Sequence, residues 1–286
     1  MRTSDITDPL FRDAVEAIDN GNIILLQKLL ETNPQLISMR LDIPTEGYFK
    51  HPYLLWFVAD NPIRHDKLPS NIVDITRVLI KFVRQYDKEN FDQQIGYTFG
   101  LVETGRIPRE CGVQIELLDL LMENGAEPGN AQAALANGNI DAAKHIIEKS
   151  GYITLTAAVC LSRMDHVKRL LANSAPDEKE VALMAAAFYG KPEMIELLIK
   201  SGTNVNAYIK TGFHSHASPL HQAIYSGSLE SVKILVEAGA DLNATDTIYN
   251  GTPLGWATYM QTEENDNDAK KRYLEIGNYI LTKQNK

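Results

Sequence analysis

Hydrophobic residues recur along this chain at helical spacing, in short segments that each follow a small or turn-forming residue. After Gly227, the apolar residues Leu229, Val232 and Leu235 fall on one face of a helix, and Gly239 supplies its expected end. The same order of turn residue, short spacer and amphipathic segment begins at Gly21, Asn71, Val113, Gly138, Ser162 and Gly190. The pattern therefore predicts a series of short amphipathic helices.

A second, alanine-rich segment precedes most of these helices. These segments read DAVEAIDN, AQAALAN, TLTAAVCL, VALMAAAFY and SPLHQAIYS. Small residues allow two helices to approach each other closely, because the distance between helix axes depends on the side chains at the contact. The repeated unit is therefore expected to be helix, tight turn, helix.

This unit resembles the ankyrin repeat, whose signature contains T-P-L-H-x-A. The resemblance is clearest in SPLHQA (Ser218–Ala223), in TPLGWA (Thr252–Ala257) and in LVEAGADLNATD (235–246). The N-terminal half is more divergent, and HPYLLWFVAD at 51–60 only faintly repeats the same opening. The resemblance implies an all-α fold: a solenoid of helix–turn–helix repeats with a few β-hairpin finger loops.

The repeats account for essentially the whole chain, so we expect residues 1–286 to form one solenoid of about eight helix pairs. Residues 1–112 are divergent, and extra length falls in stretches that are typical of loops, at 33–52, 61–70 and 103–112. Residues 113–260 hold the clearest repeats, with a finger at 202–217 that is long enough to protrude. Residues 261–286 are expected to supply a C-terminal capping helix.

The charge and the composition narrow the classes of partner. There are 37 acidic and 28 basic residues, a formal charge of -9, which repels phosphate backbones, so no nucleic-acid partner is expected. No apolar run approaches the length of a membrane span, the start of the chain has no apolar signal core, and the acidic run at 262–268 suggests a solvated loop. Cys111 and Cys160 are predicted to be buried free thiols, and we expect a cytoplasmic monomer.

No motif for catalysis or for a cofactor is present. The chain contains no GxSxG, GxxxxGK[ST], GxGxxG or HExxH run. Acidic residues such as Glu193 and Glu230 recur at one place in the unit, the first turn of the second helix, where the helix dipole favours them. A position repeated in every unit indicates scaffold, so we expect a protein that is not an enzyme and needs no cofactor.

Three histidines lie close together in the sequence, at 214, 216 and 221. His221 is the fourth residue of the signature, and the resemblance implies that its imidazole bonds nearby backbone and ties adjacent repeats together. His214 and His216 could share a metal ion if the finger were a strand, because alternate strand residues point to one face. The only third ligand near them is His221, which is committed to the helix, so no metal site is expected.

The exposed face of such a solenoid is formed by the first helix of each pair and by the fingers. The register of SPLHQAIYSG places Gln222, Tyr225 and Ser226 outwards, and the equivalent positions of the first unit are Glu16, Asp19 and Asn20. Aromatic residues gather towards the C-terminal part of this face, and aromatic side chains anchor many protein interfaces. The predicted contact residues are Phe188, Tyr189, Tyr208, Phe213, His214, His216, Gln222, Tyr225, Tyr249, Trp256 and Tyr259.

These observations favour a non-catalytic protein–protein interaction module, such as an adaptor, a scaffold or an inhibitor, which binds a protein partner on its concave face. Two alternatives stay open. One is an effector or immunity-type protein that blocks one specific enzyme. The other is an accessory protein that binds a small molecule in its divergent N-terminal half, around Trp56.

Overall fold

The computed structural model describes residues 3–42, 47–210 and 212–285, and within them it contains helices and no strand. The all-α repeat fold expected from the sequence is therefore confirmed. The chain divides into two compact units, residues 1–150 and residues 151–286, which we describe separately. None of the helices in the described ranges combines the length and apolar character that a membrane crossing needs.

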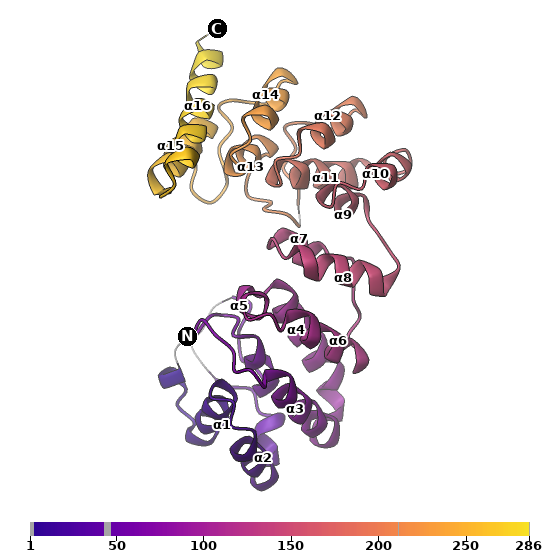
Figure 1. Cartoon of the computed structure of the whole chain (residues 1–286), viewed down its shortest axis with the longest axis vertical. Coiled ribbons are helices and arrows are strands. Elements are labelled where there is room, and N and C mark those ends of the chain that lie inside the picture. The colour runs from indigo at the N-terminus through magenta and orange to yellow at the C-terminus, as the bar shows by residue number, and fades with distance from the viewer. Residues whose placement is uncertain (1–2, 43–46, 211, 286) are drawn as a thin grey trace. The chain divides into compact units, whose positions relative to one another are not determined.

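The first unit consists of two layers of helices (Figure 1). In one layer α1, η3, α4 and α7 follow each other in contact, and α2, α3, α6 and α8 do the same in the other. The α-helices are α1 (Pro9–Asp19), α2 (Ile23–Thr32), α3 (Ile72–Tyr86), α4 (Phe91–Thr104), α5 (Arg106–Glu110), α6 (Gln114–Glu123), α7 (Gln132–Ala136) and α8 (Ile140–Ser150). The 3-10 helices are η1 (Thr3–Asp5), η2 (Pro34–Ile37), η3 (Leu54–Ala59) and η4 (Lys88–Asn90).

The short helix η3 replaces a full first helix in the second pair of this unit. All six of its residues are buried, and it ends at Asp60, whose φ of 44° lies in the left-handed region. Trp56 is 2% exposed and stacks on Tyr97 with ring centroids 4.0 Å apart. Trp56 is therefore a core side chain.

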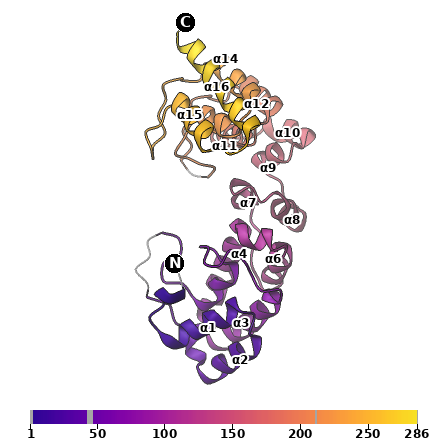
Figure 2. The same ribbon diagram turned by 60° about the vertical axis from the view of Figure 1, so that its left-hand side comes forward.

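The second unit repeats one helix pair four times within residues 151–286 (Figures 1 and 2). The first helices α9, α11, α13 and α15 pack in sequence, and the second helices α12, α14 and α16 form the neighbouring layer with α10 against α9. Their bounds are α9 (Leu155–Cys160), α10 (Met164–Leu171), α11 (Pro176–Phe188), α12 (Pro192–Lys200), α13 (Pro219–Tyr225), α14 (Leu229–Glu237), α15 (Pro253–Glu263) and α16 (Asn267–Gln284). Alanines at these contacts, among them Ala186, Ala223 and Ala257, are at most 1% exposed, which confirms their predicted role in close helix packing.

The predicted turn residues lie where the two helices of a pair meet. Gly190 and Gly227 have φ values of 56° and 69°, in the left-handed region that glycine enters without the steric cost of a Cβ atom. Ser162 has the same conformation at the equivalent place, with φ of 54°. The first three helix pairs of this unit thus share this backbone requirement, and glycine meets it most readily.

Several predicted loops and cysteines differ from expectation. The stretch 103–112 contains α5. The acidic run at 262–268 forms a loop only at 264–266, because α15 continues to Glu263 and α16 begins at Asn267. The finger at 202–217 has no strand in its described residues, and its apolar side chains other than Tyr208 are buried. Both cysteines are free, but Cys111 is exposed, whereas burial raises the pKa of the Cys160 thiol to about 12.

Candidate functional site

An aromatic hollow of about 610 Å³ lies between α13, α15 and the loop that precedes α15. Its lining consists of Tyr225, Tyr249, Gly251, Gly255, Trp256, Tyr259 and Met260. Tyr225, Tyr249 and Tyr259 are 47%, 76% and 62% exposed, so their rings are available to a ligand. We refer to this feature as the tyrosine hollow.

Helix α15 places three lining side chains on one face. Trp256, Tyr259 and Met260 are three and four residues apart, the spacing at which side chains lie over one another along a helix. Gly255 occupies the position of His221 in the preceding repeat, so the side chain that fills this place there is missing here. Glycine in place of the signature histidine is therefore the sequence signal for the hollow.

The loop on the other side of the hollow is organised around the buried carboxylate of Asp246. This carboxylate accepts hydrogen bonds from the backbone N–H groups of Ile248, Tyr249 and Gly251, at 2.9, 2.6 and 2.8 Å. The indole Nε1–H of Trp256 donates a fourth, at 3.0 Å. Burial raises the pKa of Asp246, but these donors together outweigh it and lower the pKa to about 2. The carboxylate is therefore ionised at neutral pH and fixes both the loop and the indole ring.

His221 has the structural role that the repeat resemblance implied. Its imidazole is fully buried, and its Nδ1 accepts from the Ser218 backbone N–H at 3.4 Å and lies 2.8 Å from the Ser218 hydroxyl. Its Nε2 lies 3.0 Å from the carbonyl oxygen of Gly251. The ring thus links the start of α13 to the loop before α15, and burial lowers its pKa.

A stack of rings continues from the hollow towards α11. Phe188 at the end of α11 is parallel to Tyr225 within 11°, with centroids 5.6 Å apart, and His214 stacks on Phe188 at 4.6 Å. Tyr189 meets Phe188 edge-on, and burial raises the pKa of the Tyr189 hydroxyl. Phe188, Tyr189 and His214 are half-buried, so they support the exposed Tyr225 ring.

The finger histidines do not point in parallel as strand residues would. His214 has φ of 36°, and its ring is nearly perpendicular to that of His216 at 6.1 Å between centroids. His216 lies 6.1 Å from Trp256. In the described part of the chain, no three His, Cys, Asp or Glu residues are grouped so that they could hold a metal ion.

Two predicted contact residues are buried, and their predicted exposure is wrong. Gln222 is 1% exposed, like Ala157 and Ala185 at the same place in earlier repeats, because this position faces the neighbouring first helix. Phe213 is 0% exposed, because the finger folds back and packs this ring against Phe188 at 6.0 Å. Tyr208 is 41% exposed, but its hydroxyl donates to the carbonyl of Thr245 at 2.8 Å, away from the lining of the hollow.

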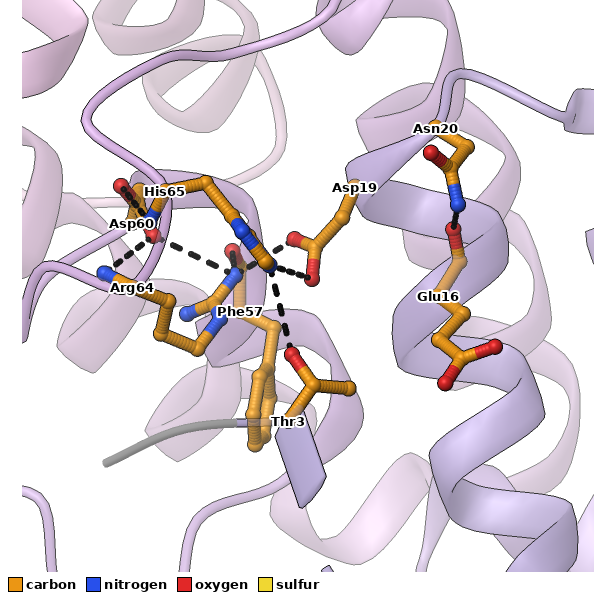
Figure 3. Close-up of polar contacts among 8 residues, drawn as sticks. All are labelled: Thr3, Glu16, Asp19, Asn20, Phe57, Asp60, Arg64 and His65. Atoms are coloured by element: carbon orange, nitrogen blue, oxygen red, sulfur yellow. Dashed lines mark hydrogen bonds and ion pairs between the residues drawn. The ribbon is translucent and has the colours of Figure 1, made fainter. Parts of the chain in front are cut away.

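One of the three outward positions of the first unit, Asp19, belongs to a different kind of cluster (Figure 3). The fully buried Arg64 guanidinium lies 2.7 Å from Asp19 and 3.6 Å from Asp60, and it also donates to the Phe57 carbonyl at 3.0 Å. His65 reaches Asp19 at 3.0 Å, whereas the exposed Glu16 carboxylate points away from this group. Asp19 is therefore engaged within the fold and is not a contact residue.

A comparison with protein families identifies the repeats. Residues 110–246 match the family model described as ankyrin repeats in three copies. Residues 110–246 belong to the ankyrin repeat family. The match includes α13 and Tyr225, and it ends at Asp246, just before the remaining lining residues of the tyrosine hollow.

Relatives of these ankyrin repeats occur in proteins of very different organisms. The chain is 39% identical over 71 residues to the ankyrin repeat protein FPV233 of Fowlpox virus. The aligned segment covers 24% of this chain and 13% of that protein. It is 34% identical over 130 residues to a Danio rerio protein that carries the name palmitoyltransferase ZDHHC13. That alignment covers 43% of this chain and 17% of the relative. An ankyrin repeat protein of Rickettsia felis is 33% identical over 121 residues, 40% of this chain and 38% of the relative. The chain thus spans well under half the length of each.

Proposed function

We propose that this chain is a non-catalytic protein-interaction module whose partner binds at the tyrosine hollow. The ankyrin repeats support an interaction role, because this family typically binds proteins and carries no chemistry of its own. The single observation that carries the choice of surface is the group of exposed rings around one hollow of about 610 Å³. Exposed tyrosine and tryptophan side chains in a concave site are typical anchors of protein interfaces.

The surroundings of Trp56 give less support to a small-molecule site in the first unit. Trp56 is packed against Tyr53 and Tyr97, so its ring belongs to the core. A hollow of about 160 Å³ elsewhere in this unit is lined by polar residues such as Asp13 and Glu16, below the size usual for ligand pockets. The free cysteines support a reducing compartment, and we place the protein in the cytoplasm on that ground.

The test is affinity purification followed by mass spectrometry, with the double variant Tyr225→Ala/Tyr259→Ala beside the unaltered protein. The two residues are 47% and 62% exposed, so the double variant is expected to melt within a few degrees of the unaltered protein while it loses its partner. Tyr152→Ala is the matched control, because Tyr152 is 60% exposed and does not line the hollow. Equal capture of the same proteins by all three chains would refute this surface.

A further inference from the structure

We propose that the tyrosine hollow receives a cationic side chain, lysine or arginine, from a basic segment of the partner protein. This inference rests on the proposed function, because it names the chemistry of the partner that would bind this face. It is carried by the aromatic lining, by a buried carboxylate bonded to the indole N–H, and by the balance of charge around the site.

The lining supplies several π faces to one ligand. Tyr225, Tyr249, Trp256 and Tyr259 all border the same hollow, and a cation within about 6 Å of a ring centroid is attracted by the ring quadrupole. Trp256 gives the strongest such interaction among aromatic side chains. A hollow with several such rings can replace part of the hydration shell of an ammonium or guanidinium group.

A fixed negative charge lies at the N–H edge of the tryptophan ring, the best of these cation-binding rings. The ionised Asp246 carboxylate accepts the Trp256 Nε1–H at 3.0 Å, which makes the indole face more negative. Within the described residues no lysine or arginine pairs with Asp246, and its four hydrogen bonds come from neutral N–H groups. Asp246 is only 1% exposed, so solvent screens its charge weakly.

The sequence around the hollow extends this negative field. Residues 241–268, which include this loop and α15, contain six acidic residues and no lysine or arginine. Basic residues flank them on α14 (Lys233) and at the start of α16 (Lys270, Lys271 and Arg272). Lys233 lies on α14 with its ammonium 5.8 Å from the Tyr279 ring, and neither residue lines the hollow. Glu263 is exposed and follows Trp256, Tyr259 and Met260 on the same face of α15, one helical turn beyond Tyr259.

The charge favours a basic partner segment over the other occupants of an aromatic hollow. An acidic segment would be repelled by Asp246 and Glu263. A purely apolar side chain would gain no electrostatic attraction from Asp246. A basic side chain satisfies both features, because its methylene groups cover the rings while its charged end meets the negative potential.

The experiment compares n-butylguanidinium with n-butylurea, a neutral molecule of nearly the same shape, on the full-length protein. Binding is followed by the indole N–H signals in nitrogen-15 NMR spectra. The chain has two tryptophans, so the signal of the buried Trp56 serves as an internal reference for that of Trp256. We expect n-butylguanidinium to shift the Trp256 signal at roughly fivefold lower concentration than n-butylurea, and added salt to weaken the charged probe alone.

A pair of variants at Tyr259 tests whether the ring carries the effect. Tyr259 is 62% exposed, so neither Tyr259→Phe nor Tyr259→Leu should disturb the fold. Tyr259→Phe keeps the π face and is expected to keep the preference for n-butylguanidinium, whereas Tyr259→Leu should weaken its binding by roughly threefold or more. Equal binding of the two probes to the unaltered protein would overturn the proposal, and so would equal losses in the two variants.

This outcome is distinguishable from a failure of the proposed function. If the two probes bind equally while the Tyr225→Ala/Tyr259→Ala variant still loses its protein partner, the surface stands and only the cationic chemistry is wrong. If the double variant keeps its partner, the hollow is not the protein-binding surface, whatever the probes show.

Discussion

At the scale of single residues, the two glycines of the tyrosine hollow differ in the space that surrounds them. A Cβ atom at Gly251 would lie 2.9 Å from Asp246 Oδ2 and from Trp256 Nε1, whereas at Gly255 its nearest contact is Thr252 Oγ1 at 3.4 Å. Gly251→Ala is therefore expected to destabilise the protein by about 1–3 kcal/mol, because it forces apart the Asp246–Trp256 hydrogen bond. Gly255→Ala should be neutral or stabilising, since alanine favours the first turn of α15 by up to about 1 kcal/mol.

Thermal melts followed by circular dichroism measure both variants, and the indole N–H signal of Trp256 reports the local hydrogen bond. We expect that signal to move in Gly251→Ala and to stay close to its place in Gly255→Ala. If Gly251→Ala melts at the same temperature as the unaltered chain, the loop of 246–251 accommodates the Cβ atom without loss of stability.

The same scale shows how far sequence reasoning reaches into the site. Tyr225 and Tyr259 could be predicted as exposed, because the repeat register sets which side of the first helix faces outwards. The burial of Gln222 and Phe213 could not be predicted in this way. It depends on how closely the next helix approaches Gln222 and on how the finger packs Phe213 against Phe188. Such distances are set by tertiary packing, and the local pattern of apolar residues does not report them.

At the scale of elements, His221 joins one repeat to the next by two hydrogen bonds on opposite sides of its ring. His221→Phe keeps a flat aromatic ring, slightly larger than the imidazole, but leaves the Gly251 carbonyl without one of its two donors and the Ser218 N–H without its acceptor. Removing partners from buried polar groups costs about 1–3 kcal/mol, and we expect a loss of stability in this range.

This loss should depend on pH. Burial is the main cause that lowers the pKa of His221, against the opposing effects of the Gly251 bond and Asp246, while His216 lowers it further. The neutral imidazole is thus favoured in the folded state, so its stabilising effect is complete above the unfolded pKa of about 6.5 and is lost as the pH falls towards the folded value. The difference in free energy of unfolding between the unaltered protein and His221→Phe, measured in urea, should narrow from pH 8 to pH 5; a constant difference would contradict this account.

The elements themselves were largely predictable where the repeats are regular. The turns at Gly190 and Gly227 require a left-handed backbone, which favours glycine, so these turns can be recognised in the sequence. The short helix η3 and the helix α5 were not predicted, because HPYLLWFVAD lacks the alanines and the spacing of a first helix, and Pro108 lies inside α5. Their helical state is imposed by the layers against which they pack.

At the scale of the whole molecule, the ankyrin match at 110–246 crosses the boundary between the two compact units. The prediction of one solenoid over residues 1–286 agrees with repeats on both sides of that boundary but stays a prediction. In an array where each repeat contacts only its neighbours, a local loss of stability should remain local. The buried Arg64 offers a way to measure this.

Arg64→Met removes the guanidinium that lies between Asp19 and Asp60. It leaves the buried Asp60 carboxylate without its cation, and Asp19 keeps only its contact with His65. Breaking such a buried pair costs about 3–5 kcal/mol. We expect hydrogen–deuterium exchange, followed by mass spectrometry, to become faster in α1, η3 and α3 and to stay unchanged in α13–α16. Arg77→Met is the matched control, since Arg77 and Asp74 form an exposed pair worth less than about 1 kcal/mol. Faster exchange throughout the chain would instead show that the two units unfold as one cooperative body, and the nearest-neighbour description of this array would then be wrong.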